Sequence, residues 1–232
     1  MRIINNIKLK PIQNGSHIQT QGHIVLKANQ KLDVSASTIN SEHGSVQLVG
    51  QDVSITHAHE QEDYSDKFYS KNDGFLSSSS ARSQSEYQRS TAVGSNITGK
   101  DVAIKAHNNL LVSGSQIISD DGTQLTAGGH VQITSAENTL SENSHAQIKK
   151  SGLMSTGSLG VTIGSKQTTD EQDNTSLTYT ASTVGSLKGN TTIVAGKNYE
   201  QTGSIVHGGE EGDTLIAAQK IDVKAAENRY TN

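Results

Sequence analysis

The fold is decided by residues 99–135, GKDVAIKAHNNLLVSGSQIISDDGTQLTAGGHVQITS. Apolar residues recur in this stretch at a fixed distance: Ile104 and Leu125 are 21 positions apart, and so are Val112 and Ile133. Between the turns, apolar and polar residues alternate, which is the period of a β-strand with one buried face. The stretch therefore predicts short strands arranged in coils of about 21 residues.

The same pattern occurs three times along the chain. Residues 22–60 match residues 100–138 at an offset of 78 positions, and a third copy, from about Gly189, matches at an offset of 89 to 90. Each copy contains two coils. We therefore predict one domain over residues 1–232, built from three modules at about 16–60, 94–138 and 185–228.

Composition points to the way these coils bury their apolar residues. Of the 232 residues 31% are hydrophobic and 3% aromatic, with 22 Gly and 1 Pro, well below the roughly 45% apolar content of an average globular chain. Short strands of constant spacing bury a face only if each coil stacks on the next with parallel strands. We therefore predict an all-β fold, a right-handed parallel β-helix whose interior is too narrow for Trp. The residues predicted to point inward are Leu26, Val34, Leu48, Ile55, Ile104, Val112, Leu125, Ile133, Ile193, Leu215, Ile221 and Val223.

Two segments between the modules, about residues 57–93 and 137–184, interrupt the coil pattern. We interpret both as extended β-hairpins that project from the helix or lie along it, the first being shorter and frayed near Ser77 to Ser90. Both are expected to return to the coils through one signal, Val93-Gly94-Ser95 and Val184-Gly185-Ser186. Because serine and charged runs break the alternation, these hairpins should be the most mobile and protease-sensitive parts.

The arrangement resembles the haemagglutinin repeats of the filamentous haemagglutinin and contact-dependent growth inhibition family, the long exoproteins of bacterial two-partner secretion. The resemblance rests on residues 99–106, 112–117 and 127–138 with the hairpin flanks Lys150-Ser151-Gly152-Leu153 and Val184-Gly185-Ser186, and it covers about residues 20–230. It implies a rod segment of a secreted or cell-surface adhesin, or of a toxin-delivery exoprotein. Since the parts that correspond to the family's N-terminal secretion domain and C-terminal toxin domain are not recognised here, we expect the chain to be an interior piece of such an exoprotein or a truncated reading frame.

The histidines of His57-Ala58-His59-Glu60 are the closest approach to a metal motif. Alternation on a strand places both imidazoles on one face, as a metal-binding pair requires. The sequence fixes no third ligand, and the aligned positions of the second module are Ser135 and Glu137. We therefore expect a solvated strand end, with a metal site as the alternative, and assign no metal ligand.

Acidic turns at residues 120–122 and 208–213 offer oxygen atoms to Ca²⁺, but they lack the nonapeptide period of calcium-binding β-rolls. We interpret them as tight turns that need glycine at positive φ. The outward positions Lys27, Lys105 and Val194, or Ser54, Gln132 and Asp222, form no ladder of carboxylates. We assign no catalytic or cofactor-binding residue and no cofactor, and we keep a carbohydrate-active β-helix enzyme as the alternative function.

The charge balance and the absence of cysteine restrict the kinds of binding partner and chemistry that we expect. With 19 Lys+Arg against 23 Asp+Glu, and no basic cluster among aromatic residues, we expect no nucleic-acid binding. The absence of Cys excludes disulfides and thiolate chemistry, and residues 1–8 lack the apolar stretch of an export signal. The expected partners are a target-cell receptor or carbohydrate, an outer-membrane transporter reached through other parts of the exoprotein, and a second strand edge through end-to-end association.

Overall fold

Every regular element of the computed structural model is a β-strand, over the described residues 2–155 and 161–232; side chains are described for residues 8–152 and 163–232. This confirms the predicted all-β class. The strands form two parallel sheets and one antiparallel sheet. The described residues contain no helix with the length and apolar character that a membrane span needs.

The parallel strands make up what we call the coil stack. Its strands are β2 (His17–Thr20), β3 (Ile24–Lys27), β4 (Lys31–Ser35), β5 (Thr38–Ser41), β6 (Val46–Gly50), β7 (Asp52–Thr56), β10 (Asn96–Ala106), β11 (Leu110–Ser113), β12 (Gln116–Ala127), β13 (Val131–Thr134), β16 (Thr183–Ser186), β17 (Thr191–Ala195), β18 (Asn198–Thr202), β19 (Ile205–His207), β20 (Thr214–Ala217) and β21 (Lys220–Lys224).

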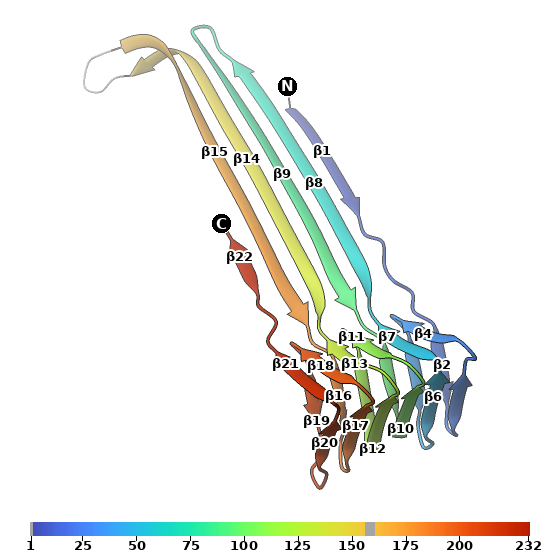
Figure 1. Ribbon diagram of the computed structural model, residues 1–232. Helices are drawn as coiled ribbons and strands as arrows, with labels where there is room; N and C mark the ends of the chain where they lie inside the picture. The colour runs from blue at the N-terminus through green and yellow to red at the C-terminus, as the bar shows by residue number, and fades with distance from the viewer. Residues whose placement is uncertain (1, 156–160) are drawn as a thin grey trace.

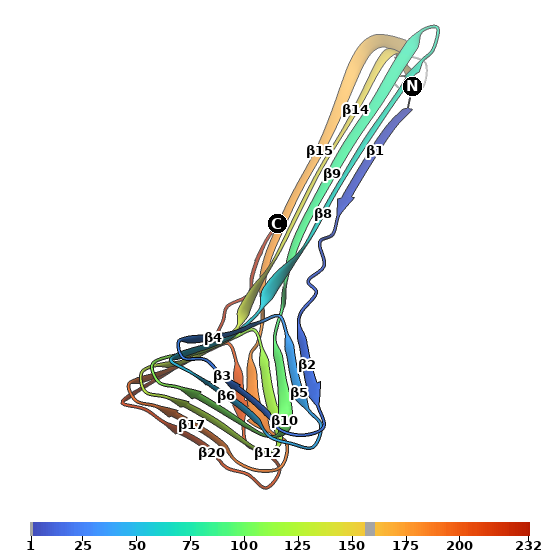
Figure 2. The ribbon, with the colours of Figure 1, turned by 90° about the vertical axis from the view of Figure 1, so that its right-hand side faces the viewer.

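Three rows of parallel strands enclose the interior of this stack, as Figure 2 shows. The rows run β2-β5-β10-β12-β16-β19, β3-β6-β10-β12-β17-β20 and β4-β7-β11-β13-β18-β21, because β10 and β12 each continue around a corner from the first row into the second. One pass of the chain through the three rows is one coil. Neighbouring coils are in register 21 residues apart at Leu110↔Val131, and 68 residues apart at Val131↔Tyr199, where a hairpin intervenes.

The interior of the coil stack is lined by the alternate residues of each strand. Most residues predicted to point inward are fully buried, and Leu26 packs partly buried against them. The buried members of the predicted set are Val34, Leu48, Ile55, Ile104, Val112, Leu125, Ile133 and Ile193. One aromatic residue, Tyr199, is also fully buried there, and the low aromatic content had not suggested it.

The last coil departs from the prediction. Leu215 is wrong, because Ile193 is in register with Ile216, so that Leu215 takes the outward position and is exposed. Ile221 is in register with the buried Tyr199 and so lies in an inward row, as does Val223 two residues on. Both are nevertheless exposed, because no described strand stacks beyond β21.

A column of serines follows one corner through all six coils. The backbone N–H of each serine donates to the hydroxyl oxygen of the next, from Ser16 to Ser37 (3.0 Å), Ser95 to Ser115 (3.0 Å) and Ser115 to Ser182 (3.2 Å), with Ser204 in the last coil. The return signal predicted at residues 184–186 is therefore misplaced. Ser182 is the counterpart of Ser95, whereas residues 184–186 lie inside β16 against residues 117–119.

At this corner the chain either closes directly or leaves the stack. In the first, third and fifth coils one residue with positive φ closes the corner: Ala36 (45°), Gly114 (56°) and Gly203 (54°). After the second and fourth coils the chain leaves instead as a hairpin. The first hairpin is β8 (Ala58–Asp73) with β9 (Ser77–Val93), and the second is β14 (Ala136–Ser155) with β15 (Val161–Thr180).

The two hairpins are not separate projections. Strand β9 pairs with β14, and the outer strands β1 (Arg2–Leu9) and β22 (Arg229–Thr231) join the edges, which gives one antiparallel sheet in the order β1-β8-β9-β14-β15-β22. We call it the arm sheet; it projects from the serine corner well beyond the stack (Figure 1). The prediction of fraying near Ser77 to Ser90 is wrong, because these residues belong to β9, which pairs on both sides.

Candidate functional site

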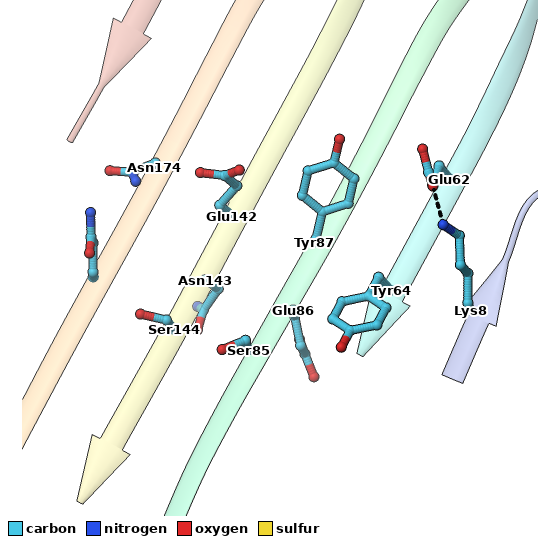
Figure 3. A pocket seen from close by; sticks show the side chains of 11 residues that line it. Lys8, Glu62, Tyr64, Ser85, Glu86, Tyr87, Glu142, Asn143, Ser144 and Asn174 are labelled. Atoms are coloured by element: carbon cyan, nitrogen blue, oxygen red, sulfur yellow. Dashed lines mark ion pairs between the residues drawn. The ribbon is translucent and has the colours of Figure 1, made fainter. Parts of the chain in front are cut away.

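A row of side chains crosses the arm sheet and combines aromatic rings with charged and amide groups. Strand register places Lys8 opposite Tyr64, Tyr64 opposite Tyr87, Tyr87 opposite Glu142, and Glu142 opposite Asn174. Residues directly opposite in a sheet project to the same face. Figure 3 shows this tyrosine row spread over β1, β8, β9, β14 and β15.

The row lines an open groove of about 490 Å³. Tyr64 is 36% exposed and Tyr87 is half-buried, so that the phenol rings remain accessible beside the carboxylate of Glu142 and the amide of Asn174. Tyrosine offers a flat apolar surface and a hydroxyl together, while amide and carboxylate groups bind hydroxyls. The arrangement can therefore hold a polar ligand by shallow contacts, without a deep pocket.

An ion pair lines one end of the groove. The Lys8 Nζ and Glu62 Oε1 atoms lie 2.9 Å apart, as the dashed line in Figure 3 marks. The hydrogen bond from Lys8 lowers the pKa of the Glu62 carboxyl, and the same bond raises the pKa of Lys8. Glu62 is therefore ionised in the neutral range and binds β1 to β8, rather than acting as a proton donor.

The predicted histidine pair lies at the root of the first hairpin. The Nε2 atoms of His57 and His59 are 3.2 Å apart, and the rings are edge to face with centroids at 4.8 Å. The Nδ1 of His59 contacts the Ser90 hydroxyl (3.1 Å), and that of His57 contacts the Ser113 backbone oxygen (3.3 Å). The two rings share a face as predicted. In the part of the chain that the structure describes, no group of three or more metal-ligating side chains occurs.

Glycines of the acidic turns do not have the predicted positive φ. The positive-φ glycines of the described chain are at positions 114, 152 and 203, and Gly122 lies inside β12. Gly209 and Gly212 instead allow close packing against the neighbouring coil, because a Cβ on Gly209 would lie 2.2 Å from the Lys188 carbonyl carbon. The sequence suggested the right residue type there for the wrong physical reason.

Two neighbouring outward carboxylates near the end of the coil stack, Glu200 and Asp222, are paired with lysines. Glu200 and Asp222 are neighbours in register, and Lys224 Nζ lies 3.6 Å from the first and 3.3 Å from the second. The hydrogen bond from Lys220 is the main cause of the lowered pKa of Asp222. A glycosidase acid needs a carboxyl with a raised pKa, so this pair favours a solvated structural surface over a catalytic one.

The tyrosine row had not been predicted from the sequence. A usable signal was present, because Tyr64 and Tyr87 stand at equal distances from the hairpin turn and must therefore face each other in a regular hairpin. The serine and charged runs around them concealed it, since such runs are also typical of a linker.

Comparison with known proteins relates the chain to one family. The family described as hemagglutinin repeat matches residues 76–232. The chain is 32% identical over 201 residues to the tRNA nuclease CdiA of Escherichia coli (strain STEC_O31), covering 84% of this chain and 6% of that protein. It is 32% identical over 225 residues to the 16S rRNA endonuclease CdiA of Enterobacter cloacae, covering 94% of this chain and 7% of that protein.

A third relative, the deoxyribonuclease CdiA of Yersinia pseudotuberculosis, is 38% identical over 121 residues, which are 52% of this chain and 11% of that protein. The chain thus spans only a small fraction of these relatives' length. No solved structure matches. The family match extends over more than half of the sequence, from β9 through the last four coils to β22, so the chain belongs to the hemagglutinin-repeat family.

Proposed function

We propose that this chain is a structural segment of a secreted, cell-surface exoprotein that delivers a toxin by contact-dependent growth inhibition, and that it helps to contact the target cell. The coil stack is, on this proposal, a right-handed parallel β-helix forming one domain of three modules. Support comes from parallel register through six coils, from the family match, and from the relatives named as CdiA nucleases.

The segment contributes length and surface rather than catalysis. The chain covers 6% and 7% of two nuclease relatives, so we infer that their nuclease activity and the contact with an outer-membrane transporter belong to other regions. The inward but exposed Ile221 and Val223 support stacking of a further coil on this end, which is the predicted end-to-end association.

The tyrosine row is the main structural observation that supports the proposed contact with target cells. It lies on a sheet that projects away from the stack, and no described strand packs on either face of that sheet (Figures 1 and 2), so the row is accessible to a receptor or a carbohydrate. Shallow contacts of this kind are individually weak and become effective when many copies bind together. Binding should therefore be multivalent.

The test couples the chain to beads and measures how many beads bind to target cells. Replacing Tyr64 and Tyr87 by Ala should reduce binding, while Tyr69→Ala should leave it unchanged, because Tyr69 is on the opposite face and packs with Arg82 at 5.1 Å. Equal binding by all variants would refute the role of the row. Turnover of a polysaccharide by the purified chain would instead support the alternative, a carbohydrate-active β-helix enzyme.

A further inference from the structure

The outer edge of β15 is largely unpaired. Its inner edge pairs with β14 along the whole strand, from Ser155↔Val161 to Ala136↔Thr180. On the outer edge β22 pairs only with Thr175–Leu177, and no other described strand lies beside residues 163–174. Alternate residues of such an edge point both backbone N–H and C=O outward, which makes the edge a template for another strand.

The short strand β22 indicates what fits this edge. Arg229–Thr231 follow the last coil as Thr139–Ser141 follow the fourth coil, at the offset of 90 that relates the two modules. Their pairing is also equivalent: Thr139 is opposite Ser90 of the preceding hairpin, and Arg229 is opposite Leu177. β22 therefore begins a pairing with β15 that is the same as the pairing of β14 with β9.

The equal spacing of stacked coils and paired strands allows the pairing of β14 with β9 to be repeated by β22 with β15. Stacked coils and paired strands are both separated by about 4.8 Å, and one two-stranded hairpin leaves the stack for every two coils. Two coils and one hairpin therefore advance by the same distance, about 10 Å. A strand that leaves the corner after the sixth coil is delivered directly beside β15, as β22 is (Figure 1).

The exposed edge is acidic. Residues 163–174 contain Asp170, Glu171 and Asp173 against one lysine, Lys166, and no proline. Glu171 is bonded to His145 Nδ1 at 3.1 Å, whereas Asp170 and Asp173 are exposed and stand opposite the uncharged Ala146 and Asn143 of β14. A second strand with cations opposite these two aspartates would gain attraction on the outer edge.

We propose that residues 163–174 of β15 form a docking edge for an extended polypeptide strand that runs antiparallel to β15, continues the line of β22, and carries basic residues opposite Asp170 and Asp173. The strand takes the register on the outer edge that β14 takes on the inner edge. The edge meets the end of the tyrosine row at Asn174 but includes neither of its tyrosines.

The probe is a synthetic peptide with the sequence of residues 142–155, ENSHAQIKKSGLMS. Added at millimolar concentration to the full chain, it should slow hydrogen exchange at alternate amides of residues 163–174. A peptide with Asn143→Lys and Ala146→Lys should bind roughly two- to five-fold more tightly per new charge pair. The chain variant with Asp170→Lys and Asp173→Lys, both exposed positions, should lose this gain.

The matched control peptide carries His145→Pro and Ile148→Pro, which remove ladder donors on both parities of the strand. It should give no protection. Equal protection by this control, or protection outside β15, overturns the proposal. Slow exchange at residues 163–174 without peptide, together with sedimentation as a dimer, overturns the proposed occupant in favour of a second copy. Cell binding by the Tyr64 and Tyr87 variants is a separate measurement, so either proposal can fail alone.

Discussion

The hydroxyl of Ser95 donates a hydrogen bond to the carbonyl oxygen of Thr56 at 2.7 Å, which joins the two residues that flank the first hairpin although residues 57–94 lie between them. Ser182 makes the equivalent bond to Thr134 at 2.6 Å across the second hairpin. At a closed corner Ser115 bonds to Ser113 at 2.9 Å. The corner thus has the same geometry whether one residue or a whole hairpin intervenes, and this allows hairpins to be inserted without disturbing the stack.

The serine column should be sensitive to loss of a single hydroxyl. Ser182 is fully buried, and its oxygen accepts the N–H of Ser115. Ser182→Ala leaves this buried donor unsatisfied, so we expect the free energy of unfolding to fall by about 1–3 kcal/mol in urea titrations. Ser204→Ala, at the partly buried end of the column, should cost less than about 1 kcal/mol. Equal losses at the two positions would contradict the role of burial.

Because Gly114 and Ala36 both close the corner with positive φ, we expect Gly114→Ala and Ala36→Gly to have different effects on stability. Gly114 has φ 56°, and an added Cβ would lie 2.4 Å from the Cβ of Ala136. Gly114→Ala should therefore lower stability by at least about 1–2 kcal/mol. Ala36 has φ 45° without being glycine, so Ala36→Gly should be neutral or raise stability by up to about 1 kcal/mol. Thermal unfolding of both variants is the measurement; a stabilising Gly114→Ala would refute the argument.

Much of the coil stack could be predicted because a short repeating pattern in the sequence determines which residues line its interior. Alternation and a constant coil length determine which residues line the interior, and Val112 and Ile133 are accordingly in register as their spacing indicates. The last module was misassigned at Leu215, because its turn at residues 208–213 is longer and Ile216, one residue further on, takes the inward position. A change of one residue in turn length reverses the faces of the strand that follows.

The arm sheet could be predicted only in part. Each hairpin has its own signal in the sequence, but pairing of Tyr87 with Glu142 joins two hairpins and depends on the equal spacing of coils and strands. No pattern within either hairpin encodes that relationship. The groove with its tyrosine row depends on that relationship, which is why no candidate site was predicted there from the sequence.

Burial, rather than position in a row, should determine the cost of a charge in the interior. Ile133, Gln201 and Val223 occupy one inward row, in which Ile133 is fully buried and Val223 is 64% exposed. Ile133→Asp should cost several kcal/mol because it buries an unpaired charge. Val223→Asp is the matched control and should cost less than about 1 kcal/mol. Comparable urea midpoints for the two variants would contradict the proposed interior.

Acid should release β1 from the arm sheet. The pKa of Glu62 is lowered by the hydrogen bond from Lys8, so the contribution of this pair is present above the ordinary carboxyl range, near pH 4.3, and is lost as the pH falls through the lower folded value. Hydrogen exchange at β1 amides should accelerate over that range. Glu62→Gln should abolish the pH dependence, whereas Glu86→Gln should retain it, since Glu86 pairs with Gln84 instead.

Alkali should destabilise the coil stack through Tyr199. Burial raises the pKa of this phenol to about 12, and its hydroxyl donates to the side-chain oxygen of Gln201 at 2.9 Å. A raised folded pKa means that stability is fully present below the unfolded value, near 10, and is lost as the pH rises from there through about 12. The loss should reach roughly 2–3 kcal/mol. Urea unfolding at pH 9 and pH 11.5 should show it in the native chain and in Tyr230→Phe, whose phenol is exposed, but not in Tyr199→Phe. An alkaline loss of the same size in Tyr199→Phe would assign the effect to other groups and would refute the role of the buried phenol.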